Sequence, residues 1–167
     1  MSRYCLTMQI ARSGRFVFVA QWFLAALLPV FFFLGRGFIG AEVGWVGIIG
    51  LVYGIIVIFV LLVPPLLTLF DGEVRKAKAT RAGYDLATAL LWGALLFGAL
   101  TVPDSGDSGH LNSALTTWTN GAISYETSAA IFYGAAVVMG LAYLAAFVTA
   151  TMGIVRSRRA GVSSPIA

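Results

Sequence analysis

VGWVGIIGLVYGIIVIFVLLVPPLLTLF, residues 43–70, contains no charged side chain and decides the fold of this chain. A transmembrane helix needs about 20 consecutive, mostly apolar residues, and this run is longer than that. Backbone groups in lipid need internal hydrogen-bond partners, so only helices and closed barrels span membranes. Barrel strands alternate polar and apolar residues over about 10 positions, whereas this run is continuous. We therefore predict a transmembrane helix over 43–70, kinked at Pro64-Pro65.

Three further uncharged runs have the same character and extend over about 16–35, 84–102 and 128–155. The first follows a basic segment, as a secretory signal would, but no small-residue cleavage site follows it, so we expect it to be retained. Of the 167 residues, 59% are hydrophobic and 11% are charged, whereas soluble domains carry about 25% charged residues. The sequence predicts one all-α domain over 1–167, an integral membrane bundle of four transmembrane helices.

Lysine and arginine are concentrated in alternate connecting segments. Cytoplasmic segments of membrane proteins carry an excess of these residues, and here only Arg36 falls in the opposite set. We therefore predict a multi-pass protein of the inner membrane with both termini in the cytoplasm. The bias to arginine and the richness in alanine, glycine and valine favour a bacterial origin. The ten residues on the predicted cytoplasmic side are Arg3, Arg12, Arg15, Arg75, Lys76, Lys78, Arg81, Arg156, Arg158 and Arg159.

Small residues recur at spacings of three and four along the second predicted span. Such spacing places them on one helix face, and small residues let helix backbones approach closely in lipid. Two interpretations remain open: this face meets another helix of the same chain, or it binds a second protein or a second copy. The glycines concerned are Gly40, Gly44, Gly47, Gly50 and Gly54.

The predicted external loop over 103–127 has a pattern of its own. Leu111, Leu115 and Trp118 recur at helical spacing, and Asn120-Gly121 is a stop signal, so we predict a short amphipathic helix. We expect any external partner to contact these three residues. Oxygen and imidazole ligands also lie within reach of one another, although the same segment reads as a plain turn. These weak metal candidates are Asp104, Asp107 and His110.

The chain offers few groups for catalysis or cofactor binding. Its one cysteine, Cys5, excludes an internal disulfide, and its one histidine excludes a bis-histidine haem site. No ionisable residue lies at the middle of a span, where proton-coupled transporters usually keep one. Gln21 is the polar exception in the first span, and we expect it to make an interhelical hydrogen bond. We predict no cofactor.

Three functions remain as hypotheses. The first is a non-catalytic accessory or scaffolding subunit of a larger inner-membrane complex, because small-residue faces abound and catalytic groups are scarce. The second is a homo-oligomeric channel or transporter with its pore near the glycine-rich span. The third is a membrane-surface enzyme on a lipid substrate, with Asp71, Glu73 or Asp85 as acid, base or metal ligand. The expected partners are the lipid bilayer and a membrane protein or a second copy, and no nucleic acid, because the basic residues flank apolar runs.

Overall fold

Four long helices dominate the computed structural model, which describes residues 1–167 except 1–9, 108 and 163–167. Each of the four is long and apolar enough to cross a membrane. The prediction of an all-α membrane bundle is thus confirmed. Arg3 and Cys5 lie outside the described residues. The four helices are α1 (Gly14–Phe33), α2 (Trp45–Thr68), α4 (Ala82–Thr101) and α6 (Tyr125–Val162).

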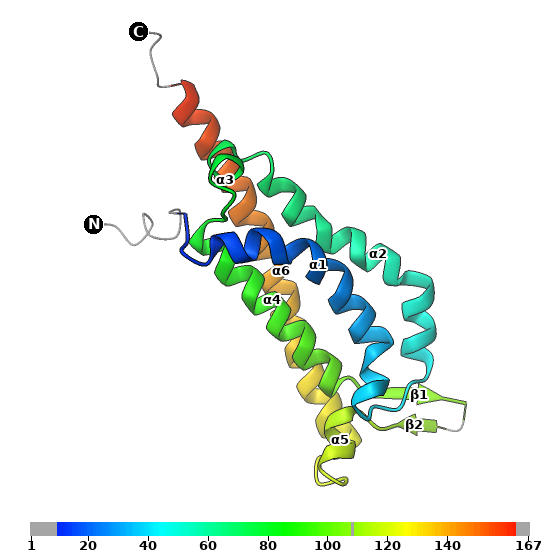
Figure 1. The fold of residues 1–167 in the computed structure, drawn as a ribbon. Coiled ribbons are helices and arrows are strands. Elements are labelled where there is room, and N and C mark those ends of the chain that lie inside the picture. Colours follow the sequence, from blue (N-terminus) through cyan, green and yellow to red (C-terminus); the bar gives the residue numbers. More distant parts are fainter. Residues whose placement is uncertain (1–9, 108, 163–167) are drawn as a thin grey trace.

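Short elements close the two ends of the bundle (Figure 1). One end carries α3 (Gly72–Ala77) and the residues that connect it to α4; it is called the basic end. The opposite end carries η2 (Gly35–Ile39), β1 (Asp104–Gly106), β2 (Gly109–Leu111) and α5 (Ala114–Trp118); it is called the hairpin end. The strands β1 and β2 pair antiparallel, and Ser105 lies opposite His110. The beginning of α1 and the end of α6 both lie at the basic end.

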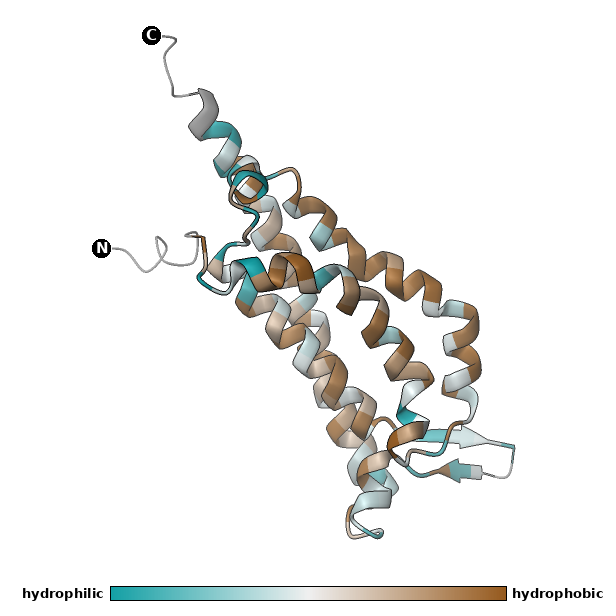
Figure 2. Cartoon of the chain, in the orientation of Figure 1, coloured by the Kyte–Doolittle hydropathy of each residue, from teal (hydrophilic) through white to brown (hydrophobic). Residues whose placement is uncertain are grey.

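Helix α4 is the central helix and α2 is the peripheral one. Half of the most apolar window of α4 is buried inside the protein, against 11% of the corresponding window of α2. Helix α2 consists largely of apolar residues, as its brown colour in Figure 2 shows, and large apolar side chains of both α2 and α6 are exposed. Leu51 and Phe59 of α2, for example, are 70% and 65% exposed. A surface of this kind is stable in lipid rather than in water.

Helix α2 continues through Pro64 and Pro65 and ends at Thr68. A proline has no amide hydrogen to donate to the carbonyl four residues earlier, which for Pro64 is that of Val60. The Tyr143 hydroxyl of α6 donates to the Val60 carbonyl oxygen instead, at 3.0 Å. A neighbouring helix therefore replaces the hydrogen bond that the proline removes.

The five glycines of the predicted face divide into two groups, because α2 begins only at Trp45. Gly40 ends η2 with a φ of 94°, a left-handed conformation that favours glycine, and Gly44 is the N-cap of α2. Gly47, Gly50 and Gly54 lie within α2 and are buried. A Cβ atom at Gly50 would overlap the Phe33 side chain of α1. This part of the face is thus covered by α1, and a role in binding a second protein stays a prediction.

Gly50→Ala should destabilise the protein by about 1–3 kcal/mol, because the added methyl group has to displace Phe33. The measurement is the free energy of unfolding by steric trapping in lipid nanodiscs. Gly140→Ala is the matched control, since no atom lies within 4 Å of its Cβ position and alanine is the better helix former. Equal stability of the two variants would contradict the contact between α1 and α2.

Candidate functional site

At the basic end, Arg81 joins the segment before α4 to the beginning of α3. Its guanidinium donates from Nε to Asp71 Oδ2 at 2.7 Å and from Nη2 to Glu73 Oε2 at 2.7 Å. Asp71 is also the N-cap of α3 and accepts the Glu73 amide at 3.0 Å. Burial alone would lower the pKa of Arg81, but the hydrogen bonds and charges of the two carboxylates outweigh burial and raise it.

Asp85, in the first turn of α4, joins the beginnings of α1 and α4. Its carboxylate accepts the Ser13 hydroxyl at 2.7 Å and also the Thr80 hydroxyl. The two segments run so close that the Thr80 amide donates to the Gly14 carbonyl oxygen at 3.1 Å. A Cβ at Gly14 would lie 2.7 Å from the Thr80 nitrogen, so only glycine permits this approach. The carboxylate therefore holds two helix ends together.

The three carboxylates of the enzyme hypothesis thus have partners within the chain. Asp71 and Asp85 are buried, whereas Glu73 is half exposed and bound to Arg81. The cavity bordered by Asp71, Arg81 and Tyr84 holds only about 10 Å³, which is at the lower limit for one water molecule. No lipid fits in this cavity, and the hydrogen bonds of the three carboxylates link the beginnings of α1, α3 and α4.

At the hairpin end, Arg36 of η2 forms an ion pair with Asp104, the first residue of β1. Both side chains are completely buried. The Asp104 carboxylate also accepts the backbone amides of Gly44, Val46 and Ser105, at 2.7, 2.9 and 2.7 Å. Two of these amides lie at the beginning of α2, where the helix dipole favours a negative charge. One carboxylate thus fixes the end of α1, the beginning of α2 and the hairpin.

The arginine of this pair is not fully satisfied. Its Nη1 atom donates to the Val102 carbonyl oxygen at 3.1 Å, but among the described residues its buried Nε atom has no partner. Burial lowers the pKa of Arg36, and the charge and hydrogen bond of Asp104 oppose that shift. The stability of this end therefore depends on the carboxylate staying in place.

The three weak metal candidates are not gathered into a site. Asp104 is occupied by Arg36 and the backbone amides, and the His110 ring lies 4.2 Å from the Tyr125 ring. Asp107 lies at the exposed turn of the hairpin. Across the part of the chain that the structure describes, no three His, Cys, Asp or Glu residues are placed to hold a metal ion.

The predicted external helix is present as α5, but it is shorter than the pattern of Leu111, Leu115 and Trp118 indicates. Helix α5 begins at Ala114 because Ser113 is its N-cap and accepts the Thr116 amide at 3.1 Å. Leu111 lies in β2 instead. Trp118 is 54% exposed, and its indole N–H donates to the Ile39 carbonyl oxygen at 2.7 Å. It is the one residue of the three that has a large exposed surface.

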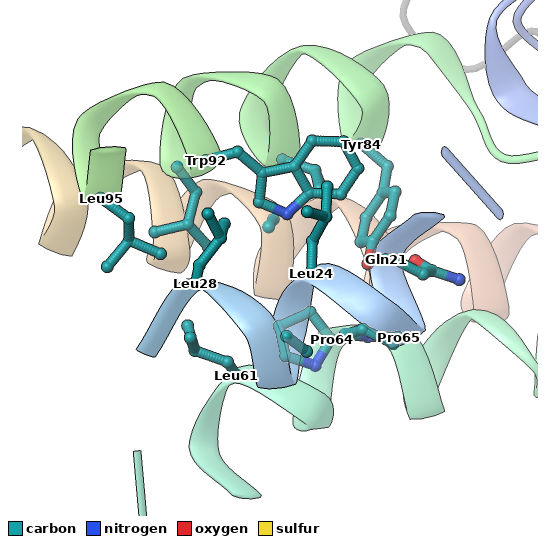
Figure 3. Close-up of a pocket in the computed structure, with 13 residues that line it drawn as sticks. Gln21, Leu24, Leu28, Leu61, Pro64, Pro65, Tyr84, Trp92 and Leu95 are labelled. Carbon is teal, nitrogen blue, oxygen red and sulfur yellow. Dashed lines mark hydrogen bonds between the residues drawn. The ribbon is translucent and has the colours of Figure 1, made fainter. Parts of the chain in front are cut away.

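Inside the bundle, Gln21 of α1 and Tyr84 of α4 form a buried pair (Figure 3). The Tyr84 hydroxyl donates to Gln21 Oε1 at 2.8 Å, and Gln21 Nε2 donates to the Phe18 carbonyl oxygen at 3.2 Å. The interhelical hydrogen bond expected for Gln21 is thereby confirmed. Tyr84, its partner, gave no signal in the sequence beyond its place near the end of an apolar run.

Neither a family of known proteins, nor a curated protein, nor a solved structure matches this chain. Function therefore has to be inferred from geometry. The geometry comprises two ends closed by buried ion pairs, a buried polar pair between them and outer faces that are apolar.

Asp104→Ala should destabilise the protein by about 3–5 kcal/mol, because it leaves the buried Arg36 without a counter-ion. The free energy of unfolding again measures the effect. Asp107→Ala, in the same hairpin but exposed, should change stability by less than about 0.5 kcal/mol. Similar losses from both substitutions would show that the ion pair does not stabilise the hairpin end.

Proposed function

We propose that this chain is a non-catalytic accessory subunit of a larger membrane assembly. Its groove between α4 and α6 would receive a transmembrane helix of a different protein. The groove is the observation that carries the proposal. It has a volume of about 570 Å³ and is lined by apolar residues alone, four of which are Ala89, Gly93, Gly134 and Ala135.

The glycines of the groove differ from those inside the bundle. No atom lies within 4 Å of a Cβ placed at Gly93 or Gly134, whereas a Cβ at Gly50 or Gly14 would collide with a neighbouring segment. A glycine within a helix costs about 0.5–1 kcal/mol relative to alanine, and no contact with a described residue requires glycine at these two positions. Small residues at a helix surface permit close packing with a second helix in lipid.

The state of the acidic side chains at the basic end supports a non-catalytic role. Asp71 and Glu73 are held by Arg81, and Asp85 is held by two hydroxyl groups. A general acid or base has to reach a substrate atom, and the cavity that Asp71 borders holds only about 10 Å³. A homo-oligomeric channel remains the alternative, in which a second copy would occupy the same groove.

Gly93→Leu and Gly134→Leu should each abolish the interaction with the partner, because leucine fills the groove. The protein is extracted in mild detergent and its complexes are weighed by native mass spectrometry. Gly140→Leu is the matched control, since its Cβ position is equally open but lies outside the groove. A wild-type homo-oligomer would favour the channel. A wild-type monomer, or a partner that both groove variants retain, would contradict the proposal.

We further propose that the basic end faces the cytoplasm of a bacterial cell, with the protein in its inner membrane. Ten of the eleven lysine and arginine residues support this orientation. In a Cys5→Ser background, a membrane-impermeant maleimide added to intact cells or spheroplasts should label Asp107→Cys and spare Lys78→Cys. Both positions are exposed on the protein surface, so a difference in labelling reports the side of the membrane and not burial within the protein. The reverse labelling pattern would show that the basic end faces the outside of the cell.

A further inference from the structure

A small cavity lies where α1, α2 and α4 meet, next to the Gln21–Tyr84 pair (Figure 3). It holds about 20 Å³. A water molecule needs roughly 10–15 Å³ on this measure, together with two to four polar partners. The cavity is thus large enough for one water molecule and too small for a larger ligand.

The Thr88 hydroxyl borders this cavity. It lies near the Tyr84 hydroxyl but makes no hydrogen bond of regular geometry with any described residue. The residue is only 4% exposed. Threonines in membrane helices usually donate to a carbonyl three or four residues earlier, as Thr101 and Thr149 do here. Thr88 makes no such bond, although an unsatisfied hydroxyl in an apolar interior is costly. The Thr88 hydroxyl therefore still needs an acceptor for its hydrogen.

The Leu61 carbonyl of α2 lacks its usual donors as well. In a helix this oxygen accepts the amide of residue 65, or that of residue 64 in a tighter turn. Both positions are proline and have no amide hydrogen. Helix carbonyls point toward the C-terminus, so this oxygen is directed toward Pro65, and Leu61 and Pro65 both line the cavity. Tyr143 provides a donor for Val60, but no described side chain donates to Leu61.

We propose that the cavity binds one structural water molecule. The water accepts a hydrogen bond from the Thr88 hydroxyl and donates to the Leu61 carbonyl oxygen and to Tyr84 Oη. The Tyr84 oxygen can accept this bond because its own hydrogen is donated to Gln21. The Thr88 hydroxyl and the Leu61 carbonyl oxygen then each have a hydrogen-bond partner.

This water would connect the peripheral helix to the central one. Helix α2 packs mainly on α1 and α6 and makes no extensive direct contact with α4. A bridging water is nearly equivalent to a direct hydrogen bond. The water therefore supplies the polar link between α2 and α4 and holds the proline-containing segment of α2 in position.

The substitution Thr88→Val tests the proposal through the sign of the change in melting temperature. Valine has nearly the shape of threonine but no hydroxyl, so packing is preserved and only the polar group is removed. If the hydroxyl binds a water molecule, the substitution removes a satisfied bond, and the melting temperature of the full-length protein should fall by about 2–4 °C. If the hydroxyl has no partner, the substitution removes an unfavourable polar group and the melting temperature should rise or stay unchanged. Either of these latter results overturns the proposal.

Two further variants control for packing. Thr88→Ser keeps the hydroxyl and should retain the water. Thr149→Val removes a hydroxyl that donates to the Ala145 carbonyl oxygen of its own helix at 2.7 Å, and it should lower the melting temperature by less than Thr88→Val. An equal or larger loss from Thr149→Val would show that the loss of any threonine hydroxyl explains the effect, and this too overturns the proposal.

Direct detection in the wild-type protein does not depend on the folding of any variant. In the wild-type protein in nanodiscs, NMR should show a cross-peak between the Thr88 methyl group and a slowly exchanging water molecule. Pro65→Ala restores an amide donor for the Leu61 carbonyl oxygen and should weaken that cross-peak, since the water loses one partner. Absence of the cross-peak in the wild-type protein, or its full retention in Pro65→Ala, would overturn the assignment.

Discussion

The ion pair between Arg36 and Asp104 is the interaction on which the hairpin end depends. It connects residues 68 positions apart. The same carboxylate accepts hydrogen bonds from the Gly44 and Val46 amides at the beginning of α2. Water is excluded from both side chains, so neither charge can be left alone without a large penalty. The position of α2 relative to α1 and the position of the hairpin are therefore fixed together. A shift of α1, of α2 or of the hairpin would therefore require the other two to move as well.

The basic end is closed in a comparable way, with Arg81 bound to Asp71 and Glu73 and with Asp85 bound to hydroxyl groups. Between the two ends, apolar packing and the hydrogen bond between Gln21 and Tyr84 hold α1 to α4. Lipid tails are as apolar as leucine, so hydrophobicity alone does not hold transmembrane helices together. The polar contacts at the ends therefore act together with close packing, such as that of Gly50 against Phe33, in arranging the helices.

The sequence predicts what depends on local composition. Uncharged runs give the four spans, and the position of Gln21 in an apolar run gives its interhelical bond. It does not predict the ion pair, because the partners are far apart and Arg36 stands out only as the exception to the charge rule. The neighbours of Asp104 are turn-forming residues, so the pattern indicates a turn with weak metal candidates rather than an ion pair. The sequence does not predict the β-hairpin for the same reason, as DSGDSG indicates a turn without indicating which strands it joins.

The glycines show how a structure separates residues that the sequence treats alike. Gly14 and Gly50 lie against other segments of the chain, where a side chain would collide. Gly93 of α4 and Gly134 of α6, by contrast, have no atom of a described residue within 4 Å of their Cβ positions. The first pair is explained by the fold of the monomer, so its substitution reports on folding. In the proposed assembly, the second pair contacts a transmembrane helix of the partner, because small residues at a helix surface permit close packing with a second helix in lipid. The groove between α4 and α6 would receive that helix, so substitution of this pair would report on association rather than on folding.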